Sequence, residues 1–251
     1  MSEPTPNGSP FDVAVIGAGP AGIAAALALH HVGARVALVG PPPTRTMQAR
    51  PETRSAALLT SSVDFLKRLG VWEQLMPAAA PLTAVRIVDA SRSLLRSPDI
   101  AFESQELGLE AFGFNIANAA LNLALYDRAR AVLAHLSPAT IASIQLDADL
   151  ATLTLDTGEE LSCRLVAGAD GRQSKCRQAA GIETREIHYE QSAIASSFRH
   201  SRPHQGVSTE LHREGGSVTS VPTPDPNMSS LVWVTGTSDA DALIAFDDDS
   251  F

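Results

Sequence analysis

Cysteine and lysine are scarce in this 251-residue chain, and basic residues do not balance the acidic ones. The two cysteines, Cys163 and Cys176, fit neither a disulfide framework nor a metal-binding spacing, so no metal site is expected. The chain holds 19 Lys and Arg against 28 Asp and Glu, a formal net charge of −9. This balance argues against nucleic acid as the main partner, because phosphate binding requires a basic face.

An uninterrupted hydrophobic run is also lacking. Residues Val13–Leu29 are apolar or small and nearly long enough to cross a bilayer. However, Gly17, Gly19 and Pro20 would break a spanning helix at its middle. The residues before this run include no Lys or Arg, so the basic start of a signal peptide is missing. We therefore expect a cytoplasmic protein without an export signal or a transmembrane helix.

What is present favours a globular α/β protein, since 44% of residues are hydrophobic and only 19% are charged. Residues Phe11–Ile16 and Arg35–Val39 are apolar and β-branched, as buried parallel strands are. Between them, Pro20–Val32 is rich in Ala and Leu and predicts a helix. The first 40 residues therefore predict a βαβ unit. Residues 1–10 are rich in Pro, Ser, Gly and Asn and predict a disordered leader.

The rest of the chain changes character along its length. Helical spacing predicts helices over 56–69 and 118–136, and residues 40–51 are predicted to form a loop. Short strands are expected at 84–88, 140–146, 151–155 and 161–167. Beyond Ile187 the pattern predicts strands only, at 192–198, 207–211, 217–221 and 230–235. This shift indicates a second, antiparallel domain.

A glycine-rich segment, Gly17-Ala18-Gly19-Pro20-Ala21-Gly22, joins the first strand to the helix. Gly17 permits the sharp turn, Gly19 lets the backbone approach a pyrophosphate, and Gly22 allows the helix to pack closely on the strand. The helix N-terminus offers N–H groups and a positive dipole end to phosphates. We expect this segment to bind a dinucleotide, and the motif alone does not distinguish FAD from NAD(P).

One usual partner of the dinucleotide is missing. The second strand of such folds commonly ends in an Asp or Glu that binds the adenine ribose. Here Val39 is followed by Gly40 and three prolines. Either the ribose is held by backbone and other side chains, or the site is weaker than usual.

A second motif, Asp170-Gly171, follows a predicted buried strand and precedes a helix that is expected to begin near Ser174. In isolation, an ordinary Asp-Gly turn is the favoured interpretation. Cys176, just beyond the turn, is interpreted as a small apolar filler.

The glycine segment and the Asp-Gly motif together resemble the class A FAD-dependent monooxygenases, the family typified by para-hydroxybenzoate hydroxylase. A closer resemblance is to the branch of that family that hydroxylates intermediates of ubiquinone biosynthesis. The resemblance extends from about Phe11 to the last residue. The segments that carry it most clearly are, in order, 52–58, 66–72, 107–118, 189–193, 199–203 and 230–233.

The resemblance implies an α/β fold in which a Rossmann-like FAD/NAD(P)-binding domain carries an inserted antiparallel-sheet substrate domain (PHBH-like). The cofactor domain is expected at 11–74 and 112–182, and an incomplete substrate domain at 75–111 and 183–251. Family members continue with a Gly-Asp motif and a long helix, so the chain is expected to be C-terminally truncated.

Site residues follow by the same resemblance. Arg54 matches an arginine that reaches the flavin, and Asn118 matches a Gln or Asn that contacts FAD at the start of a helix. The alternatives are a solvated arginine and a helix cap. In the family, the segment that contains Asp170 and Gly171 lies near the cofactor phosphates. No catalytic acid or base is assigned, because the flavin carries the chemistry.

The implied activity is hydroxylation of a polyprenyl phenol in ubiquinone biosynthesis by an FAD-dependent monooxygenase that uses NAD(P)H and O2. Peripheral association with the inner membrane or with a ubiquinone-biosynthesis complex would suit such a substrate. Two alternatives remain open. The chain could be another FAD- or NAD(P)-dependent oxidoreductase on the same scaffold, or a truncated, non-catalytic scaffold or binding protein.

Overall fold

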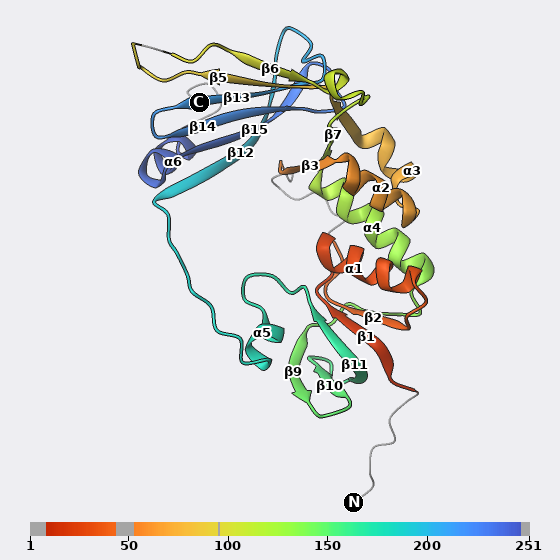
Figure 1. Ribbon diagram of the computed structural model, residues 1–251. Helices are drawn as coiled ribbons and strands as arrows, with labels where there is room; N and C mark the ends of the chain where they lie inside the picture. Colours follow the sequence, from red (N-terminus) through yellow and green to blue (C-terminus); the bar gives the residue numbers. More distant parts are fainter. Residues whose placement is uncertain (1–8, 44–52, 95, 247–251) are drawn as a thin grey trace, which may run out of the picture. The chain divides into compact units, whose positions relative to one another are not determined.

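The structure, a computed structural model, describes residues 9–43, 53–94 and 96–246 (Figure 1). The chain forms two compact units. The first contains residues 1–46, 69–71 and 121–185, and the second contains residues 47–68, 72–120 and 186–251.

A six-stranded sheet forms the first unit, and four of its strands are parallel. In spatial order the parallel strands are β8 (His135–Ser137), β2 (Val36–Val39), β1 (Phe11–Ile16) and β11 (Glu160–Gly168). The sheet continues antiparallel through β10 (Ala151–Leu155) and β9 (Ile141–Leu146). Helix α1 (Pro20–His31) connects β1 to β2, which confirms the predicted βαβ unit.

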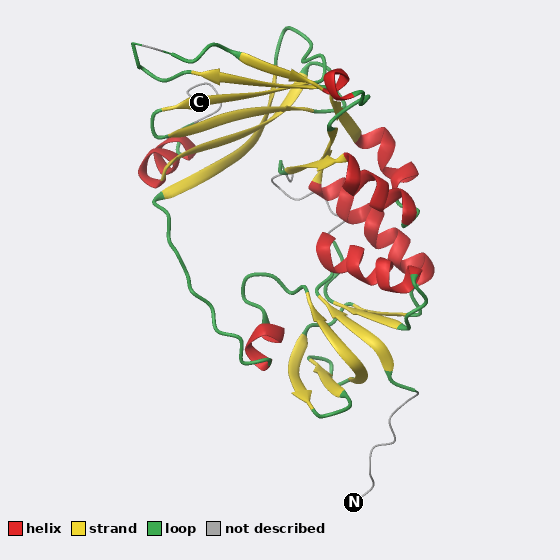
Figure 2. Ribbon diagram, in the orientation of Figure 1, coloured by secondary structure: helices red, strands yellow, loops and turns green. Residues whose placement is uncertain are grey.

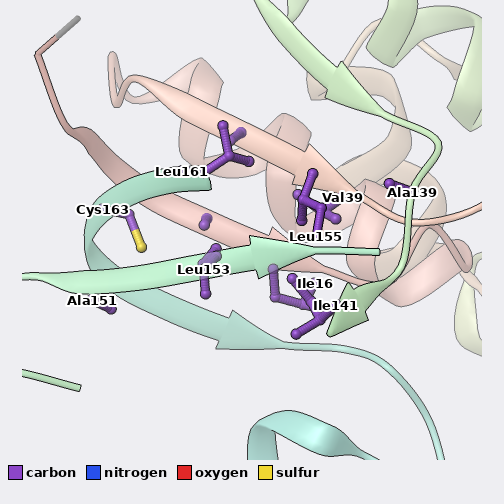
Figure 3. Packing of buried hydrophobic residues seen from close by; sticks show 11 residues of the cluster. Ile16, Val39, Ala139, Ile141, Ala151, Leu153, Leu155, Leu161 and Cys163 are labelled. Atoms are coloured by element: carbon purple, nitrogen blue, oxygen red, sulfur yellow. The ribbon is translucent and has the colours of Figure 1, made fainter. Parts of the chain in front are cut away.

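The core of the first unit joins the parallel and antiparallel parts of this sheet (Figure 3). Ile16 and Val39, the last residues of β1 and β2, belong to one buried cluster with Ile141, Leu153 and Leu155. Leu153 is completely buried, and Leu155 nearly so. Burial of the strand-ending residues fixes the points from which the next two loops leave the sheet. Those loops border the candidate site.

Two sheets make up most of the second unit (Figure 2). The larger has the strand order β12-β15-β14-β13-β5-β6, and the smaller has the order β3-β7-β4. In the larger sheet β13 pairs with β5 in parallel, whereas the other described pairs are antiparallel. The larger sheet comprises β5 (Ala84–Asp89), β6 (Ile100–Glu103), β12 (Gln191–Arg199), β13 (Val207–Arg213), β14 (Gly216–Pro222) and β15 (Met228–Gly236). The four strands expected beyond residue 187 are thereby confirmed. The expectation that this region contains strands only was wrong, because Thr237–Ile244 forms a helix after the last strand.

The remaining elements are short strands and helices. The small sheet contains β3 (Ser55–Leu59), β4 (Ala79–Leu82) and β7 (Gly113–Ala117). The helices are α2 (Thr60–Arg68), α3 (Trp72–Leu75), α4 (Asn118–Val132), α5 (Lys175–Ala179) and α6 (Thr237–Ile244), with 3₁₀ turns at Met76–Ala78 and Ser104–Leu107. Within the described residues, none of the helices combines the length and the apolar character that crossing a membrane requires.

Two helix predictions were wrong at one end. The helix expected over 56–69 begins at Thr60, because Ser55–Leu59 pairs instead with β7. A side chain on Gly113 would lie 2.1 Å from the Leu58 carbonyl oxygen, so this glycine permits the close pairing. The helix expected over 118–136 ends at Val132, and residues 135–137 form β8 beside β2.

Some predictions fall outside the described residues: most of the 1–10 leader, and the part of the 40–51 loop from residue 44 onward. The predicted domain bounds, 11–74 with 112–182 and 75–111 with 183–251, stay a prediction. The compact units group residues 53–68 and 112–120 with the larger sheet instead, because β7 pairs with β4 of the predicted substrate domain and β3 pairs with β7.

Candidate dinucleotide-binding site

The glycine segment is held between the ends of two strands. The backbone N–H of Gly17 donates to the Val39 carbonyl at 2.7 Å, and the N–H of Ala169 donates to the Ile16 carbonyl at 2.7 Å. Gly17 has a φ of +116°, and a side chain there would lie 2.2 Å from the Ala169 carbonyl oxygen. Only glycine fits this turn, because both its backbone angle and its surroundings exclude a Cβ atom.

Gly19 and Gly22 differ in what surrounds them. A Cβ on Gly22 would lie 1.8 Å from the carbonyl oxygen of Gly17, so this position is closed by the loop itself. A Cβ on Gly19 would meet no atom within 4 Å. The protein therefore does not need glycine at position 19 for its own packing, and the open space leaves the backbone accessible to a ligand.

Helix α1 begins next to this open space. Gly19 is its N-cap, Pro20 occupies its first turn, and no acidic side chain lies in that turn. The uncapped N–H groups and the positive end of the helix dipole suit an anionic group such as a pyrophosphate.

A cavity of about 580 Å³ lies along the glycine segment and the Asp-Gly turn. Five of the predicted site residues line it: Gly17, Ala18, Gly19, Asp170 and Gly171. Pro20, Ala21 and Gly22 follow in α1 and are not among the lining residues. The other walls come from the ends of β1 and β2 and from the start of β9.

Asp170 accepts hydrogen bonds from the start of α5, the helix whose N-cap is Ser174. Its Oδ1 accepts a hydrogen bond from the Ser174 hydroxyl at 2.5 Å, and its Oδ2 accepts from the backbone N–H groups of Lys175 at 2.7 Å and Cys176 at 3.2 Å. Burial raises the pKa of Asp170, but the hydrogen bonds from Ser174, Cys176 and Lys175 together outweigh it, so the pKa is lowered. The carboxylate therefore stays charged and already uses donors at the start of α5.

Cys176 is partly buried and packs against the hydrophobic cluster of the first unit, as a small apolar side chain does. Burial, followed by the negative charge of Asp170, raises the pKa of its thiol to about 12. A thiol with such a pKa stays protonated and unreactive near neutral pH.

Lys175, Thr140 and Gly40 line the cavity but were not predicted from sequence. Lys175 is the one cationic residue among the lining residues, all of which are described. Its Nζ donates to the Ile141 carbonyl at 2.5 Å. Gly40 lies where the ribose-binding acid was missing, and a Cβ there would come within 2.6 Å of the Ala18 nitrogen. In the sequence, only the glycine directly after the second strand indicated that the backbone of residue 40 approaches Ala18 this closely.

Arg54 and Asn118, the other predicted cofactor residues, lie together in the second unit. The backbone N–H of Asn118 donates to the carbonyl oxygen of Arg54 at 3.0 Å. Asn118 begins helix α4, directly after β7. The preceding residue, Thr53, donates its hydroxyl to the Ala195 carbonyl of β12 at 2.9 Å, which ties the Arg54 segment to the larger sheet.

A βαβ unit whose glycine-rich turn and helix N-terminus border a cavity at the ends of parallel strands defines a dinucleotide-binding protein. Within that class, residues 10–247 match the model of the FAD binding domain family, and the chain belongs to this family.

Curated relatives are similar over nearly all of the chain. Ubiquinone hydroxylase UbiL of Rhodospirillum rubrum is 31% identical over 243 residues, which cover 96% of this chain and 55% of that protein. The 3-demethoxyubiquinol 3-hydroxylase of Escherichia coli is 29% identical over 231 residues, 89% of this chain and 57% of that protein. The chain spans about half the length of the curated relatives it matches.

Solved structures share the fold at low identity. Pseudomonas aeruginosa PqsL superposes with a TM-score of 0.73 at 20% identity, covering 94% of this chain and 64% of that one. Klebsiella pneumoniae HpxO, solved with FAD and uric acid, gives a TM-score of 0.70 at 18% identity over 89% of this chain and 56% of that one. The predicted fold class, the family and FAD as its cofactor are confirmed. The roles of the individual site residues stay predictions.

Proposed function

We propose that the chain acts as an FAD-dependent hydroxylase that uses NAD(P)H and O2 to hydroxylate a polyprenyl phenol of ubiquinone biosynthesis. The observation that carries the proposal is the cavity that brings the glycine segment and the Asp-Gly turn together. Its volume of about 580 Å³ is within the range of about 300–1,000 Å³ that is typical of ligand sites. The names of the similar proteins supply the substrate class.

The residues present fit the pyrophosphate of FAD. Open space at Gly19 allows the backbone to approach a phosphate, and the start of α1 supplies N–H groups without a competing acid. Asp170 would repel a phosphate if it were unpaired, but its oxygens already accept three hydrogen bonds. Lys175 adds a positive charge on the cavity wall.

The adenine ribose has no carboxylate partner at the end of β2 in this chain. Thr140, Gln173 and Lys175 are the polar side chains of the cavity wall besides Asp170. The Thr140 hydroxyl donates to Asp156 at 2.7 Å, and its oxygen remains available as an acceptor. We propose that Thr140, Gln173 and Lys175 bind the ribose in place of a carboxylate.

In the proposed reaction, FAD supplies the redox chemistry when bound, taking electrons from NAD(P)H and activating O2. The chain's own residues bind the cofactor and orient it. In the first unit, the glycine segment and α1 would hold the pyrophosphate. For Arg54 and Asn118 of the second unit, contact with the flavin is a role proposed from the family resemblance alone. The proposed substrate is a phenol, which is an electron-rich ring. A polyprenyl tail also makes peripheral association with a membrane, or with a complex of biosynthetic enzymes, part of the proposal.

Three measurements test the proposal in sequence. Fluorescence titration of the purified protein with FAD tests binding. Anaerobic addition of NADH or NADPH tests reduction of the bound flavin. Turnover of a short-chain prenyl phenol under isotopically labelled O2, followed by mass spectrometry, tests hydroxylation.

We expect FAD binding, flavin reduction and one labelled oxygen atom in the product. Reduction of the flavin without label in the product would instead indicate another oxidoreductase on this scaffold. Absence of FAD binding would favour a non-catalytic binding protein.

A further inference from the structure

The loop between β5 and β6 combines exposed apolar and basic side chains. This tip loop, residues 90–98, has the sequence Ala-Ser-Arg-Ser-Leu-Leu-Arg-Ser-Pro. All of its residues except Leu95 are described. It projects at one end of the larger sheet of the second unit (Figure 1).

The base of the tip loop is fixed by Asp89. Its Oδ1 accepts from the backbone N–H of Ser91 at 3.0 Å, and its Oδ2 accepts from the N–H of Ser97 at 2.9 Å. The hydrogen bond from the Ser91 side chain, with those from the two backbone N–H groups, lowers the pKa of Asp89 to about 2. An ion pair between Arg86 and Asp99 joins the two strands below. The loop is therefore presented on a closed, hydrogen-bonded base.

The apolar side chains of this hairpin are unusually exposed. Leu94 has a relative exposure of 103%, so it touches little of its own protein. On β6, Ile100 and Phe102 are 45% and 48% exposed. They lie on one face of the strand, opposite Ile87 and Val85 of β5, because side chains alternate along a strand. The hairpin thus has an apolar face on its strands and an exposed leucine, Leu94, in its tip loop.

Charge is separated along the same hairpin. Arg92 and Arg96 are exposed in the tip loop, which contains no carboxylate. The nearest acids in the sequence, Asp89 and Asp99, lie at the base. Asp89 is bonded to backbone N–H groups and is also attracted to Arg96, and Asp99 is paired with Arg86. The positive tip contrasts with a chain whose formal net charge is −9.

We propose that the tip loop is a docking element for an anionic lipid bilayer. Leu94 would enter the boundary between headgroups and acyl chains, while Arg92 and Arg96 would extend their guanidinium groups to lipid phosphates. A bilayer suits this pattern better than a folded protein partner does, because Leu94 has no surrounding groove or ridge of its own protein to shape a complementary surface. Basic residues close to an anionic membrane surface attract it electrostatically.

The inference rests on the proposed function in one respect: a polyprenyl substrate resides in a bilayer, which gives the enzyme a reason to bind one. Vesicle binding needs neither FAD nor turnover. Loss of vesicle binding with intact FAD binding would therefore count against the docking element alone, and the reverse result would count against the hydroxylase proposal alone.

The test is co-sedimentation of the 251-residue protein with phosphatidylcholine vesicles that contain or lack about one third phosphatidylglycerol. We expect binding to the anionic vesicles only, weakened by added salt. Arg92→Gln should weaken it about fivefold, and Arg92→Gln with Arg96→Gln at least about 20-fold. Leu94→Ser should also weaken binding, with less dependence on salt. The matched controls are Arg164→Gln and Leu146→Ser, which change exposed residues of the first unit and should bind like the wild type.

A Leu94→Trp variant gives a readout at the tip itself. Its added fluorescence should shift to the blue with anionic vesicles and stay unchanged with neutral ones. No binding to either vesicle, or binding that the tip variants leave intact, would overturn the proposal. A tip variant that dissociates a dimer of this chain without changing vesicle binding would show that a second copy, rather than a bilayer, contacts the hairpin.

Discussion

The backbone N–H of Asn118 and the carbonyl oxygen of Arg54 form a hydrogen bond of 3.0 Å. The bond continues the pairing of β3 with β7, in which Ser55 lies opposite Ala117. Two residues that family resemblance assigned separately to the flavin are thus neighbours, held by the same small sheet. The backbones of the two residues are therefore fixed next to each other.

This hydrogen bond can be removed without removing the helix. Asn118→Pro eliminates the N–H donor, and proline is tolerated in the first turn of a helix. Asn118→Ala removes only the side chain. If the Asn118 side chain contacts the flavin, we expect Asn118→Ala to weaken FAD binding by about 2- to 10-fold, which corresponds to the loss of one hydrogen bond. Asn118→Pro should weaken it further, because the Arg54 backbone loses its anchor.

Fluorescence titration with FAD measures both variants, and circular dichroism checks that α4 is retained. Equal FAD affinity for the wild type and both variants would leave Asn118 as the start of a helix with no part in cofactor binding.

The different surroundings of Gly19 and Gly22 give opposite expectations for the same substitution. Gly19→Val meets no protein atom within 4 Å, so the fold should be retained while a branched side chain occupies the path of the pyrophosphate. Gly22→Val would force a side chain to within 1.8 Å of the Gly17 carbonyl oxygen, and overpacking of this kind costs about 1–3 kcal/mol or more. We expect Gly19→Val to lose FAD binding at wild-type thermal stability, and Gly22→Val to unfold at lower temperature.

Thermal denaturation separates the two effects, and FAD titration completes the comparison. Undiminished FAD affinity in Gly19→Val would remove the glycine segment from the proposed site.

Much of the fold could be predicted because its strands are either fully buried or regularly alternating. Phe11–Ile16 was located to the residue, since its apolar run is typical of a parallel strand. Residues 56–59 were assigned to a helix because apolar residues at 56 and 59 also fit helical spacing. What decides their structure is pairing with β7, a long-range contact that local periodicity does not contain.

The candidate site was predictable where one continuous segment builds it. The glycine segment needs only its own sequence to be recognised. Lys175 and Thr140 reach the same cavity from α5 and from the residue before β9, and their proximity depends on the order of β1, β11, β10 and β9 in the sheet. Sheet order is a property of the packed core, so a motif search along the chain does not find such residues.

That core predicts a large effect at Leu153. The side chain is completely buried in the cluster that also contains Ile16 and Val39, at the base of the glycine segment. Leu153→Ala should lower the free energy of unfolding by about 2–5 kcal/mol through lost burial and the remaining cavity. Leu146→Ala, at a site 53% exposed on β9, is the matched control and should cost far less. Urea denaturation measures both, and similar losses for the two variants would contradict the packing described for this sheet.

The lowered pKa of Asp170 predicts how the stability of the protein depends on pH. Its pKa is lowered in the folded protein, chiefly by hydrogen bonds that outweigh burial. The stabilisation is therefore fully present above the unfolded pKa of about 3.9 and is lost as the pH falls through the lower folded pKa. Asp170→Asn keeps the shape but not the charge, and should cost about 1–2 kcal/mol at pH 7, because hydrogen bonds to a charged acceptor are stronger than those to a neutral amide. The difference between wild type and variant should shrink below about pH 4.

The same substitution distinguishes a cap from a cofactor residue. The oxygens of Asp170 hold Ser174 and the backbone of Lys175, and Lys175 is part of the cavity wall. Loosening this turn should therefore weaken FAD binding as well as stability. Ser174→Ala is the comparison variant: it removes one hydrogen bond to Asp170 and the N-cap bond from the Arg177 N–H, but leaves the carboxylate and its backbone donors in place. Loss of stability in Asp170→Asn with unchanged FAD affinity would show that the Asp-Gly motif only ends a strand and begins a helix.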